Sequence, residues 1–327
     1  MTDRQTEYQA AIEAVRAASR VCRTVQSNLI RADTLEKRDK SPVTVADFAS
    51  QAIICERLGR ALPGDRIVGE EDAGELRAAD QEALRASVAR HVNTELAEPA
   101  SSEQVLAWID LGRAEASGAR YWTLDPIDGT KGFLRREQYA VALALIENSE
   151  VVLGVLGCPN LPASSGGQGA LFTATRDEAR ELPLWDEGVS RGEVIRVATV
   201  SSVTEARFCE SVESGHSDQD ESARIATVLG ITAEPFRIDS QCKYATVGRG
   251  DASIYLRMPT RADYREKIWD HAAGKLVVEA AGGKVTDIHG RRLDFSHGRT
   301  LQENRGVVAT SGTIHDRVIE AIRQVRG

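Results

Sequence analysis

The sequence lacks the features that mark several classes of protein. No apolar run approaches the length of a membrane span, the N-terminal segment has no signal-peptide pattern, and no internal repeat or low-complexity tract occurs. The five cysteines are odd in number, far apart and without a C-x-x-C pair, which argues against a disulfide framework and a structural zinc site. We therefore expect a soluble, cytoplasmic protein with buried free thiols.

Basic charge is also in deficit. The chain has 41 Lys and Arg against 49 Asp and Glu, a net charge of -8, which argues against nucleic-acid polymers and anionic membranes as partners. A local basic pocket for one nucleotide or another small molecule remains compatible with this charge. A chain of 327 residues can bury a substantial core, and we expect two lobes packed as one unit. The sequence leaves the oligomeric state open.

The most informative segment, 122–133, reads Trp-Thr-Leu-Asp-Pro-Ile-Asp-Gly-Thr-Lys-Gly-Phe. Its proline holds the backbone open, so that Asp125, Asp128 and the carbonyl of Ile127 can face one hard cation. The glycine and threonine that follow offer backbone N–H groups, which suit a phosphate oxygen. This spacing indicates adjacent cation and anion sites. For such a segment taken alone, a surface turn is the alternative.

Three more acids lie beside apolar segments. Asp47 precedes a helical pattern, where an N-cap or first-turn role is the alternative to a metal site. Glu70 belongs to a run of three acids after the β-branched segment 66–68. Adjacent carboxylates repel one another unless a cation is near, and a solvated turn is the alternative. Asp270 lies at the predicted start of a helix that ends at Ala281, where an N-cap role is the alternative.

Hydrophobic periodicity indicates an α/β protein. Helical spacing from Tyr8 to Leu29 predicts an amphipathic helix, and apolar runs at 139–146 and 151–156 predict a hairpin. The segment 163–169, rich in Ser and Gly, is expected to be a loop. Strands and helices alternate in the second half, which predicts a sheet covered by helices. The expected strands are 194–200, 235–238, 252–257 and 284–287, and the expected helices are 221–229, 242–249 and 270–281.

The order of these motifs resembles the lithium-sensitive, magnesium-dependent phosphatase superfamily of inositol monophosphatase and fructose-1,6-bisphosphatase. Within it, four strings are similar to the 3′(2′),5′-bisphosphate nucleotidases. They are Ser-Pro-Val-Thr-Val-Ala-Asp at 41–47, Asp-Pro-Ile-Asp-Gly-Thr-Lys-Gly-Phe at 125–133, Asp-Ser-Gln-Cys-Lys-Tyr at 239–244 and Glu-Lys-Ile-Trp-Asp-His-Ala-Ala-Gly at 266–274. Four motifs in one order are far more specific than any one of them.

The resemblance runs from about Lys40 almost to the C-terminus. It implies an α/β fold with α+β lobes, layered as an α-β-α-β-α sandwich. An N-terminal lobe, residues 1–190, would carry most of the metal ligands. A C-terminal lobe, residues 191–327, would carry the nucleotide pocket and Asp270. The segment 72–104 matches least, and nothing is carried over there; it is charged and helix-prone, which fits a lid or an insertion.

The resemblance also implies a site for two to three magnesium ions. Asp125 would bridge two ions. Glu70 and the Ile127 carbonyl would hold the first, and Asp128 and Asp270 the second.

The remaining catalytic roles follow from the same resemblance. Asp47 would act near a third ion or through its water. Thr130 would orient the attacking water and help to deprotonate it, assisted by Glu70 and Asp47. Water on the second ion would protonate the departing oxygen. Glu71 is placed outside the direct ligands.

A substrate that keeps a second phosphate needs cationic donors away from the metals. By resemblance, these contacts come from His216, Ser240, Lys243 and Arg257. Taken without the family, Lys243 would be a solvated helix residue, Arg257 a strand-end surface charge and His216 an exposed loop residue. Lys131 is ambiguous and is left out of the site. The full set expected to contact substrate is Asp128, Gly129, Thr130, His216, Ser240, Lys243, Arg257 and Asp270.

The activity implied is hydrolysis of the 3′-phosphate of 3′-phosphoadenosine 5′-phosphate to give AMP and phosphate, with 3′-phosphoadenosine 5′-phosphosulfate as a further substrate. The reaction would require magnesium and be inhibited by lithium. An inositol polyphosphate 1-phosphatase is the alternative within the same chemistry, because its substrate also carries a second phosphate. A non-catalytic nucleotide sensor is the alternative from another class, although neither Thr130 nor any metal acid is lost here.

Overall fold

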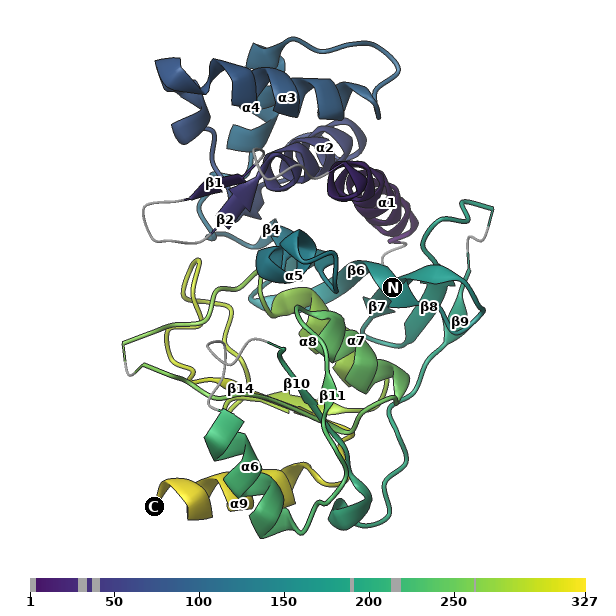
Figure 1. Cartoon of the computed structure of the whole chain (residues 1–327), viewed down its shortest axis with the longest axis vertical. Helices are drawn as coiled ribbons and strands as arrows, with labels where there is room; N and C mark the ends of the chain where they lie inside the picture. The colour runs from purple at the N-terminus through teal and green to yellow at the C-terminus, as the bar shows by residue number, and fades with distance from the viewer. Residues whose placement is uncertain (1–3, 29–33, 37–41, 189–190, 213–218, 262) are drawn as a thin grey trace.

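Two β-sheets alternate with layers of helices along the long axis of the molecule (Figure 1). The computed structural model describes residues 4–28, 34–36, 42–188, 191–212, 219–261 and 263–327. Helices α1 and α2 cover one face of the larger sheet, α7 and α8 lie between the sheets, and α6 and α9 cover the far face of the smaller sheet. This order is the predicted α-β-α-β-α sandwich. The helices are α1 (Gln5–Ser27), α2 (Val45–Ala61), α3 (Glu82–Asn93), α4 (Ser102–Asp110), α5 (Thr130–Leu134), α6 (Gln219–Leu229), α7 (Cys242–Arg249), α8 (Ala272–Ala280) and α9 (His315–Arg326).

The larger sheet has seven strands in the order β3-β4-β5-β6-β7-β8-β9. Only β3 and β4 pair in parallel, and the other neighbours are antiparallel. The predicted hairpin is confirmed as β5 and β6. The predicted loop at 163–169 is confirmed over 163–167, which connects β6 to β7, while its last two residues belong to β7. The strands are β3 (Ile67–Gly69), β4 (Arg120–Asp128), β5 (Ala140–Glu147), β6 (Glu150–Pro162), β7 (Gln168–Thr175), β8 (Ala179–Pro183) and β9 (Glu193–Val194).

The smaller sheet has five strands in the order β11-β10-β12-β14-β13. Strand β10 pairs in parallel with β11 and β12, whereas β14 is antiparallel to β12 and β13. A separate antiparallel pair, β1 (Thr34–Glu36) and β2 (Pro42–Thr44), precedes α2. The strands of the smaller sheet are β10 (Phe208–Glu210), β11 (Phe236–Arg237), β12 (Ile254–Arg257), β13 (Lys284–Thr286) and β14 (Val307–Thr310).

The predicted strand at 194–200 is wrong over most of its length, since β9 ends at Val194. The segment is rich in β-branched residues, which favour a strand, but its backbone bonds to two different elements. The Ile195 N–H donates to Ala179 O at 3.0 Å, and the Val197 N–H donates to Ala281 O at 3.1 Å. The segment therefore passes from the larger sheet to the end of α8 and never meets one continuous partner strand.

Three apolar cores correspond to the layers. One lies between the larger sheet and α1 to α4, a second between the sheets around α7 and α8, and a third between the smaller sheet and α6 with α9. Helix α1 confirms the predicted amphipathic helix, and Leu29 lies outside the described residues. The segment 72–104 contains two short 3₁₀ turns, α3 and the start of α4, and both helices pack on α2. It extends the helical layer at that end of the molecule (Figure 1).

All five cysteines are buried and free, as expected. Among the described residues, none of the helices combines the length and the apolar composition that a membrane crossing needs. The division into lobes at residues 190 and 191 stays a prediction.

Candidate metal and phosphate site

The parallel pairing of β3 and β4 brings two acids together. Gly69 lies opposite Leu124 in the register, so the residues that follow, Glu70 and Asp125, come side by side where β3 ends. The side chain of Glu70 is exposed, whereas Asp125 stays in the sheet with 3% of its surface exposed. The two acids that the sequence analysis assigns to one cation therefore share one edge of the sheet.

A β-bulge separates Asp125 from Asp128. Asp125 lies opposite Ala142 and Asp128 opposite Ala140, so β4 takes three steps where β5 takes two. Pro126 lies in this bulge, where the missing N–H breaks no regular ladder hydrogen bond. Residues three apart would face opposite sides of a regular strand, and the extra residue removes that restriction.

Asp125 interacts electrostatically with four other acids. Burial raises the pKa of Asp125 well above its ordinary value, and the negative charges of Glu70, Asp128, Asp270 and Asp47 raise it further, in that order. The Asp125 Oδ1 atom is buried and has no hydrogen-bond partner. A buried carboxylate oxygen without a partner, surrounded by like charges, is costly unless a cation is bound. An all-oxygen donor set of this kind fits magnesium.

Asp47 lies in the first turn of α2 and takes part in a capping box. Its Oδ2 atom accepts hydrogen bonds from the Thr44 N–H at 2.8 Å and from the Thr44 hydroxyl at 2.7 Å. The helix-capping alternative is therefore realised for this residue. The same carboxylate also repels Asp125, so its capping role does not remove it from the acid cluster.

The N-cap alternative for Asp270 is wrong, because α8 begins at Ala272 with His271 as its N-cap, and the predicted helix start at 270 is corrected by two residues. Burial raises the pKa of Asp270 to about 6, Arg257 lowers it, and Asp128 raises it. Nη2 of Arg257 lies 3.7 Å from Oδ2 of Asp270. Asp270 thus lies between the acid cluster and a fixed cation.

Thr130 and its neighbours form the turn that follows the bulge. Gly129 has a φ of 90° and is the N-cap of α5, a conformation that favours glycine. A Cβ atom at Gly129 would lie 2.9 Å from Cβ of Ser240, which places the Ser240 segment directly against this turn. The Thr130 hydroxyl donates to Ile127 O at 3.3 Å, so the lone pairs of its oxygen are available to accept a hydrogen bond.

Lys243 is buried, with 4% of its surface exposed, and the solvated alternative is wrong. Its Nζ atom donates to Ser211 Oγ at 3.1 Å and lies 5.3 Å from the centre of the Tyr255 ring. Burial lowers the pKa of Lys243, and Asp128 raises it more than any other charge does. The lysine therefore lies within electrostatic reach of the acid cluster. Ser240 is buried beside it in sequence, with a φ of 67°.

Arg257 ends β12, but its side chain is only 23% exposed, and the surface-charge alternative is wrong. Its Nε atom lies 2.6 Å from Oε2 of Glu266, and Nη2 donates to the Tyr264 hydroxyl at 3.4 Å. Glu266 also lies 3.0 Å from His271 Nε2. Arg257 is thus a pre-oriented cation whose guanidinium faces Asp270 and Glu266 together.

Glu266, Asp270 and His271 have possible ligand atoms within 4.8 Å of one another. This trio is a candidate metal site among the described residues, but two of its three donors, Glu266 and His271, are already engaged. His271 Nε2 contacts Glu266, and Nδ1 contacts the Tyr244 hydroxyl at 2.7 Å. The Glu266 carboxylate forms an ion pair with Arg257. We interpret the trio as a buried hydrogen-bond network that supports Asp270.

Three other residues that the sequence analysis considered for the site remain to be located in the structure. His216 lies outside the described residues. Lys131 is exposed, which fits a solvated position. Glu71 is buried, with 4% of its surface exposed.

Sequence reasoning missed three residues that support the site. Gln51 binds the backbone of Glu71, and Gln241 donates its N–H to Asp128 Oδ2 at 2.5 Å. Arg299 donates to Gly69 O and lies over the Trp269 ring, 4.7 Å from its centre. A signal exists for Gln51, since it follows Asp47 by four residues and a helix places such residues on one face. Gln241 lies inside the 239–244 motif, but Arg299 carries no signal.

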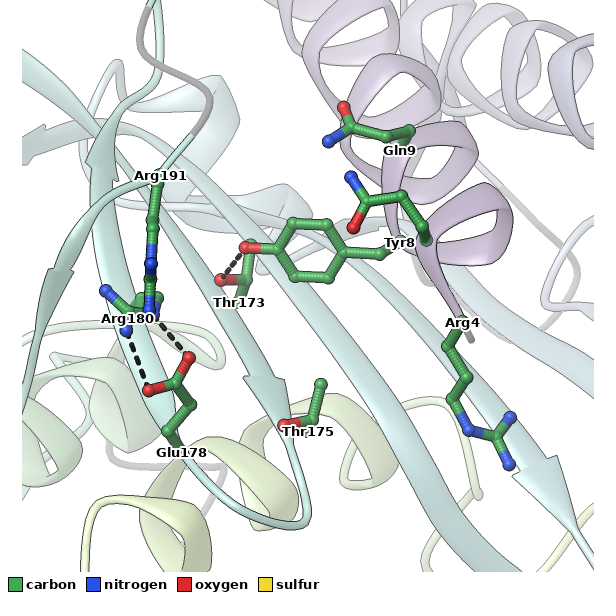
Figure 2. Close-up of a pocket in the computed structure, with 9 residues that line it drawn as sticks. Arg4, Tyr8, Gln9, Thr173, Thr175, Glu178, Arg180 and Arg191 are labelled. Atoms are coloured by element: carbon green, nitrogen blue, oxygen red, sulfur yellow. Dashed lines mark hydrogen bonds and ion pairs between the residues drawn. The ribbon is translucent and has the colours of Figure 1, made fainter. Parts of the chain in front are cut away.

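A groove of about 470 Å³ between α1, β7 and β8 is separate from these acids (Figure 2). Figure 2 shows its arginines and their partners: Arg180 pairs with Glu178, and Tyr8 bonds to Thr173. Arg4 pairs with Glu147 outside the groove. The nine residues that line it include none of the predicted site residues, so the groove does not provide the phosphate site.

Comparison with known proteins gives a consistent result. The model of the inositol monophosphatase family matches residues 3–326. The 3′(2′),5′-bisphosphate nucleotidase of Schizosaccharomyces pombe is 45% identical, over 98% of this chain and 95% of its own. The 3′(2′),5′-bisphosphate nucleotidase 1 of Arabidopsis thaliana is 45% identical over 84% and 83%, and that of Dictyostelium discoideum is 41% identical over 96% and 95%.

Solved structures agree on the fold. An IMPase of Thermotoga maritima superposes with a TM-score of 0.66 at 22% identity, covering 96% of both chains. The CysQ protein of Bacteroides thetaiotaomicron, described as a bacterial member of the inositol monophosphatase family, has a TM-score of 0.62 at 21% identity, covering 95% and 98%.

Proposed function

The chain belongs to the inositol monophosphatase family, and on that premise we propose that it is a magnesium-dependent 3′(2′),5′-bisphosphate nucleotidase of the cytoplasm. It removes the 3′-phosphate of 3′-phosphoadenosine 5′-phosphate to give AMP and phosphate, and the 5′-phosphosulfate relative is a further substrate. The identity of 41 to 45% with nucleotidases over most of the chain supports the substrate. The convergence of acids on Asp125 carries the chemistry.

The charge balance explains why this site needs cations. A phosphate dianion brought to five carboxylates would be repelled, and an incoming nucleophile would be repelled by the phosphate. Bound magnesium neutralises the phosphoryl oxygens, lowers the pKa of a coordinated water and stabilises the leaving oxygen. The residues that would hold the ions are Glu70, Asp125, Asp128 and Asp270 with the carbonyl of Ile127, and Asp47 would hold a further ion through water.

The protein's own groups then position the reactants. Thr130 donates its hydroxyl hydrogen to Ile127 O, so its oxygen accepts a hydrogen bond from the attacking water and orients one water lone pair toward phosphorus. Glu70, whose side chain is exposed at the end of β3, takes the water proton, assisted by Asp47. The N–H groups of Gly129 and Thr130 face the anion at the start of α5.

The 5′-phosphate, which is not hydrolysed, needs positively charged side chains of its own, in addition to the magnesium ions at the acid cluster. Lys243 is buried near Asp128, and Arg257 is oriented by Glu266. We assign both to the 5′-phosphate, with Ser240 and His216 as polar contacts. Because burial strips water from these groups, their hydrogen bonds to a phosphate are stronger than those of surface lysines and arginines.

The test is phosphate release from four substrates: 3′-phosphoadenosine 5′-phosphate, inositol 1,4-bisphosphate, inositol 1-phosphate and fructose 1,6-bisphosphate. Each is assayed with and without magnesium, and with added lithium. The proposal expects the nucleotide to be hydrolysed fastest, only with magnesium, and more slowly with lithium. Faster release from inositol 1,4-bisphosphate would favour the inositol polyphosphate 1-phosphatase. Equal rates on all four would remove the nucleotide assignment and keep the phosphatase.

A further inference from the structure

Two buried glutamines hold the backbone of the loops that carry Glu70 and Asp270. Gln51 lies on α2, and Gln241 directly precedes α7. Their exposed fractions are 0% and 1%. A buried amide is unfavourable unless its donor and acceptor are both paired, and each of these two is paired with a loop that bears an acid.

Gln51 binds both polar groups of the Glu71 backbone. Its Nε2 atom donates to Glu71 O at 2.5 Å and to Ile109 O at 2.9 Å, and its Oε1 atom accepts from the Glu71 N–H at 3.0 Å. All three bonds are buried. Any movement of Glu71 would break two of them, so the position of the adjacent Glu70 backbone is restricted.

Two glycines give the Gln51 amide its space. A Cβ atom at Gly69 would lie 2.5 Å from Oε1 of Gln51, and one at Gly112 would lie 2.5 Å from its Nε2 atom. Real Cβ atoms do not approach polar atoms so closely, because of steric overlap. Gly69 is thus needed at the end of β3 because its missing side chain leaves room for the Gln51 amide that holds the loop.

Gln241 binds the Asp128 carboxylate through its backbone and the backbone on either side of Asp270 through its side chain. Its Nε2 atom donates to Trp269 O at 2.9 Å, its Oε1 atom accepts from the Gly274 N–H at 3.1 Å, and its backbone N–H donates to Asp128 Oδ2 at 2.5 Å. One residue therefore contacts the carboxylate at the end of β4, the carbonyl of the residue before Asp270 and a backbone N–H in the first turn of α8.

We infer that Gln51 and Gln241 are positioning residues, whose side-chain amides hold the backbone beside Glu70 and beside Asp270 so that these two acids can bind divalent cations. Neither amide touches an ion or the substrate; each acts through backbone next to an acid. An uncharged amide suits this task because it offers a donor and an acceptor without changing the charge of the cluster. Lysine or arginine would neutralise the acids, and glutamate would add to their repulsion. The inference rests on the proposed metal-dependent function.

Asn93 provides a matched control. Its Nδ2 atom donates to Ala100 O at 3.0 Å and its Oδ1 atom accepts from the Ala100 N–H at 2.8 Å. This is the pattern of Gln51 with Glu71, but it holds the connection between α3 and α4, which carries none of the site acids. Loss of this amide removes the same kind of hydrogen bonds without touching an acid-bearing loop.

The test compares Gln51→Met, Gln241→Met and Asn93→Leu with the full-length wild type. Magnesium affinity is measured by titration calorimetry, and amide hydrogen exchange is measured on the metal-free proteins. We expect the two methionine variants to bind magnesium about tenfold or more weakly, since outer partners of metal ligands have effects of this size. Exchange should rise at 69–73 in Gln51→Met and at 269–274 in Gln241→Met. Asn93→Leu should keep wild-type magnesium affinity within about twofold.

The inference is overturned if both methionine variants bind magnesium within about twofold of wild type, whatever happens to their melting temperature. It is also overturned if Asn93→Leu weakens magnesium binding as much as the two methionine variants do. Should a methionine variant not fold, Gln→Asn at the same position keeps an uncharged amide but is one methylene shorter, so that the amide no longer reaches the backbone it holds. Faster exchange confined to the held loop would then support the inference, and unchanged exchange there would reject it.

The failure of the proposed function has a different signature. A wild type that binds magnesium but releases no phosphate from 3′-phosphoadenosine 5′-phosphate would reject the nucleotidase and leave the glutamine variants to be judged on magnesium affinity. An active wild type whose glutamine variants keep full affinity would reject only the positioning role.

Discussion

Asp125 and Glu266 are equally buried carboxylates, each 3% exposed, that the protein treats in opposite ways. Glu266 is paired with Arg257 at 2.6 Å and His271 at 3.0 Å, and although burial raises its pKa, these partners lower it below the ordinary value. Asp125 has an oxygen without a partner, and four other acids raise its pKa. The first carboxylate is neutralised from within the fold. The second requires a charge from outside, and this difference distinguishes a structural acid from one that awaits a metal.

The largest expected effect comes from Asp125→Asn. We expect turnover to fall about a thousandfold or more, equivalent to about 4 kcal/mol, because the acid cluster would lose the carboxylate that we propose as a metal ligand. The metal-free variant should nevertheless unfold at a higher temperature than metal-free wild type, since a repelled buried charge is removed. Phosphate release and thermal unfolding in chelator measure the two effects. If metal-free Asp125→Asn is less stable than metal-free wild type, the Asp125 carboxylate is stabilised by partners within the fold, as that of Glu266 is.

Glu266→Gln should produce the opposite pattern. Removing this carboxylate leaves the Arg257 guanidinium without its closest ion pair, which should cost about 3 kcal/mol of folding stability. Chemical denaturation measures this loss. The double variant Glu266→Met with Arg257→Met is the control, because it removes both charges and should be less destabilised than the single variant. If Glu266→Gln is as stable as wild type, the contacts of Glu266 with Arg257 and His271 are not what keeps this carboxylate ionised.

Thr130→Ala tests the chemistry beside Asp125 without altering its charge. We expect kcat to fall about a hundredfold with little change in KM, because the hydroxyl orients water and does not hold the substrate. Thr130→Ser keeps the hydroxyl and should retain most activity. Steady-state kinetics with 3′-phosphoadenosine 5′-phosphate measure both variants. A wild type without turnover that still binds the nucleotide would support the sensor alternative.

The smallest effect is the pH dependence of stability in metal-free protein. The pKa of Asp270 is raised to about 6, so its contribution to stability is fully present below its ordinary pKa and is lost as the pH rises through about 6. Glu266 has a lowered pKa, so its contribution is lost as the pH falls below its ordinary value. We expect metal-free wild type to lose about 2 kcal/mol between about pH 4 and pH 6 through Asp270. Denaturation curves of wild type and Asp270→Asn measure it; equal slopes would contradict the assignment.

The acids themselves could be singled out from the sequence by their local patterns, and their convergence was predicted through the resemblance. Glu70 follows a short β-branched strand, Asp125 and Asp128 enclose a proline, and Asp47 begins a helix. The parallel register of β3 and β4 then brings Glu70 beside Asp125. The layered order of the fold was predicted through the resemblance, whereas most helices of the second half were predicted from the pattern of the sequence.

The surroundings of the acids could not be anticipated, since they depend on tertiary contacts. The alternative that made Lys243 a solvated helix residue is wrong because α7 is packed between two sheets, where a helix has no solvent-facing side. The engagement of Arg257 by Glu266 depends on the turn between β12 and α8, whose path has no local signature. Gln51 was missed for the same reason, because its partners lie 20 and 58 positions away.

The hydrogen bond from the Gln241 N–H to Asp128 spans 113 positions of the chain, which has a consequence for biosynthesis. A nascent chain that ends before residue 241 already contains four of the five acids but not the backbone that holds Asp128. Ion capture should therefore be one of the last events in maturation, after the smaller sheet has docked on α7 and α8. Divalent cations would then slow unfolding of the finished molecule far more than they would speed its refolding.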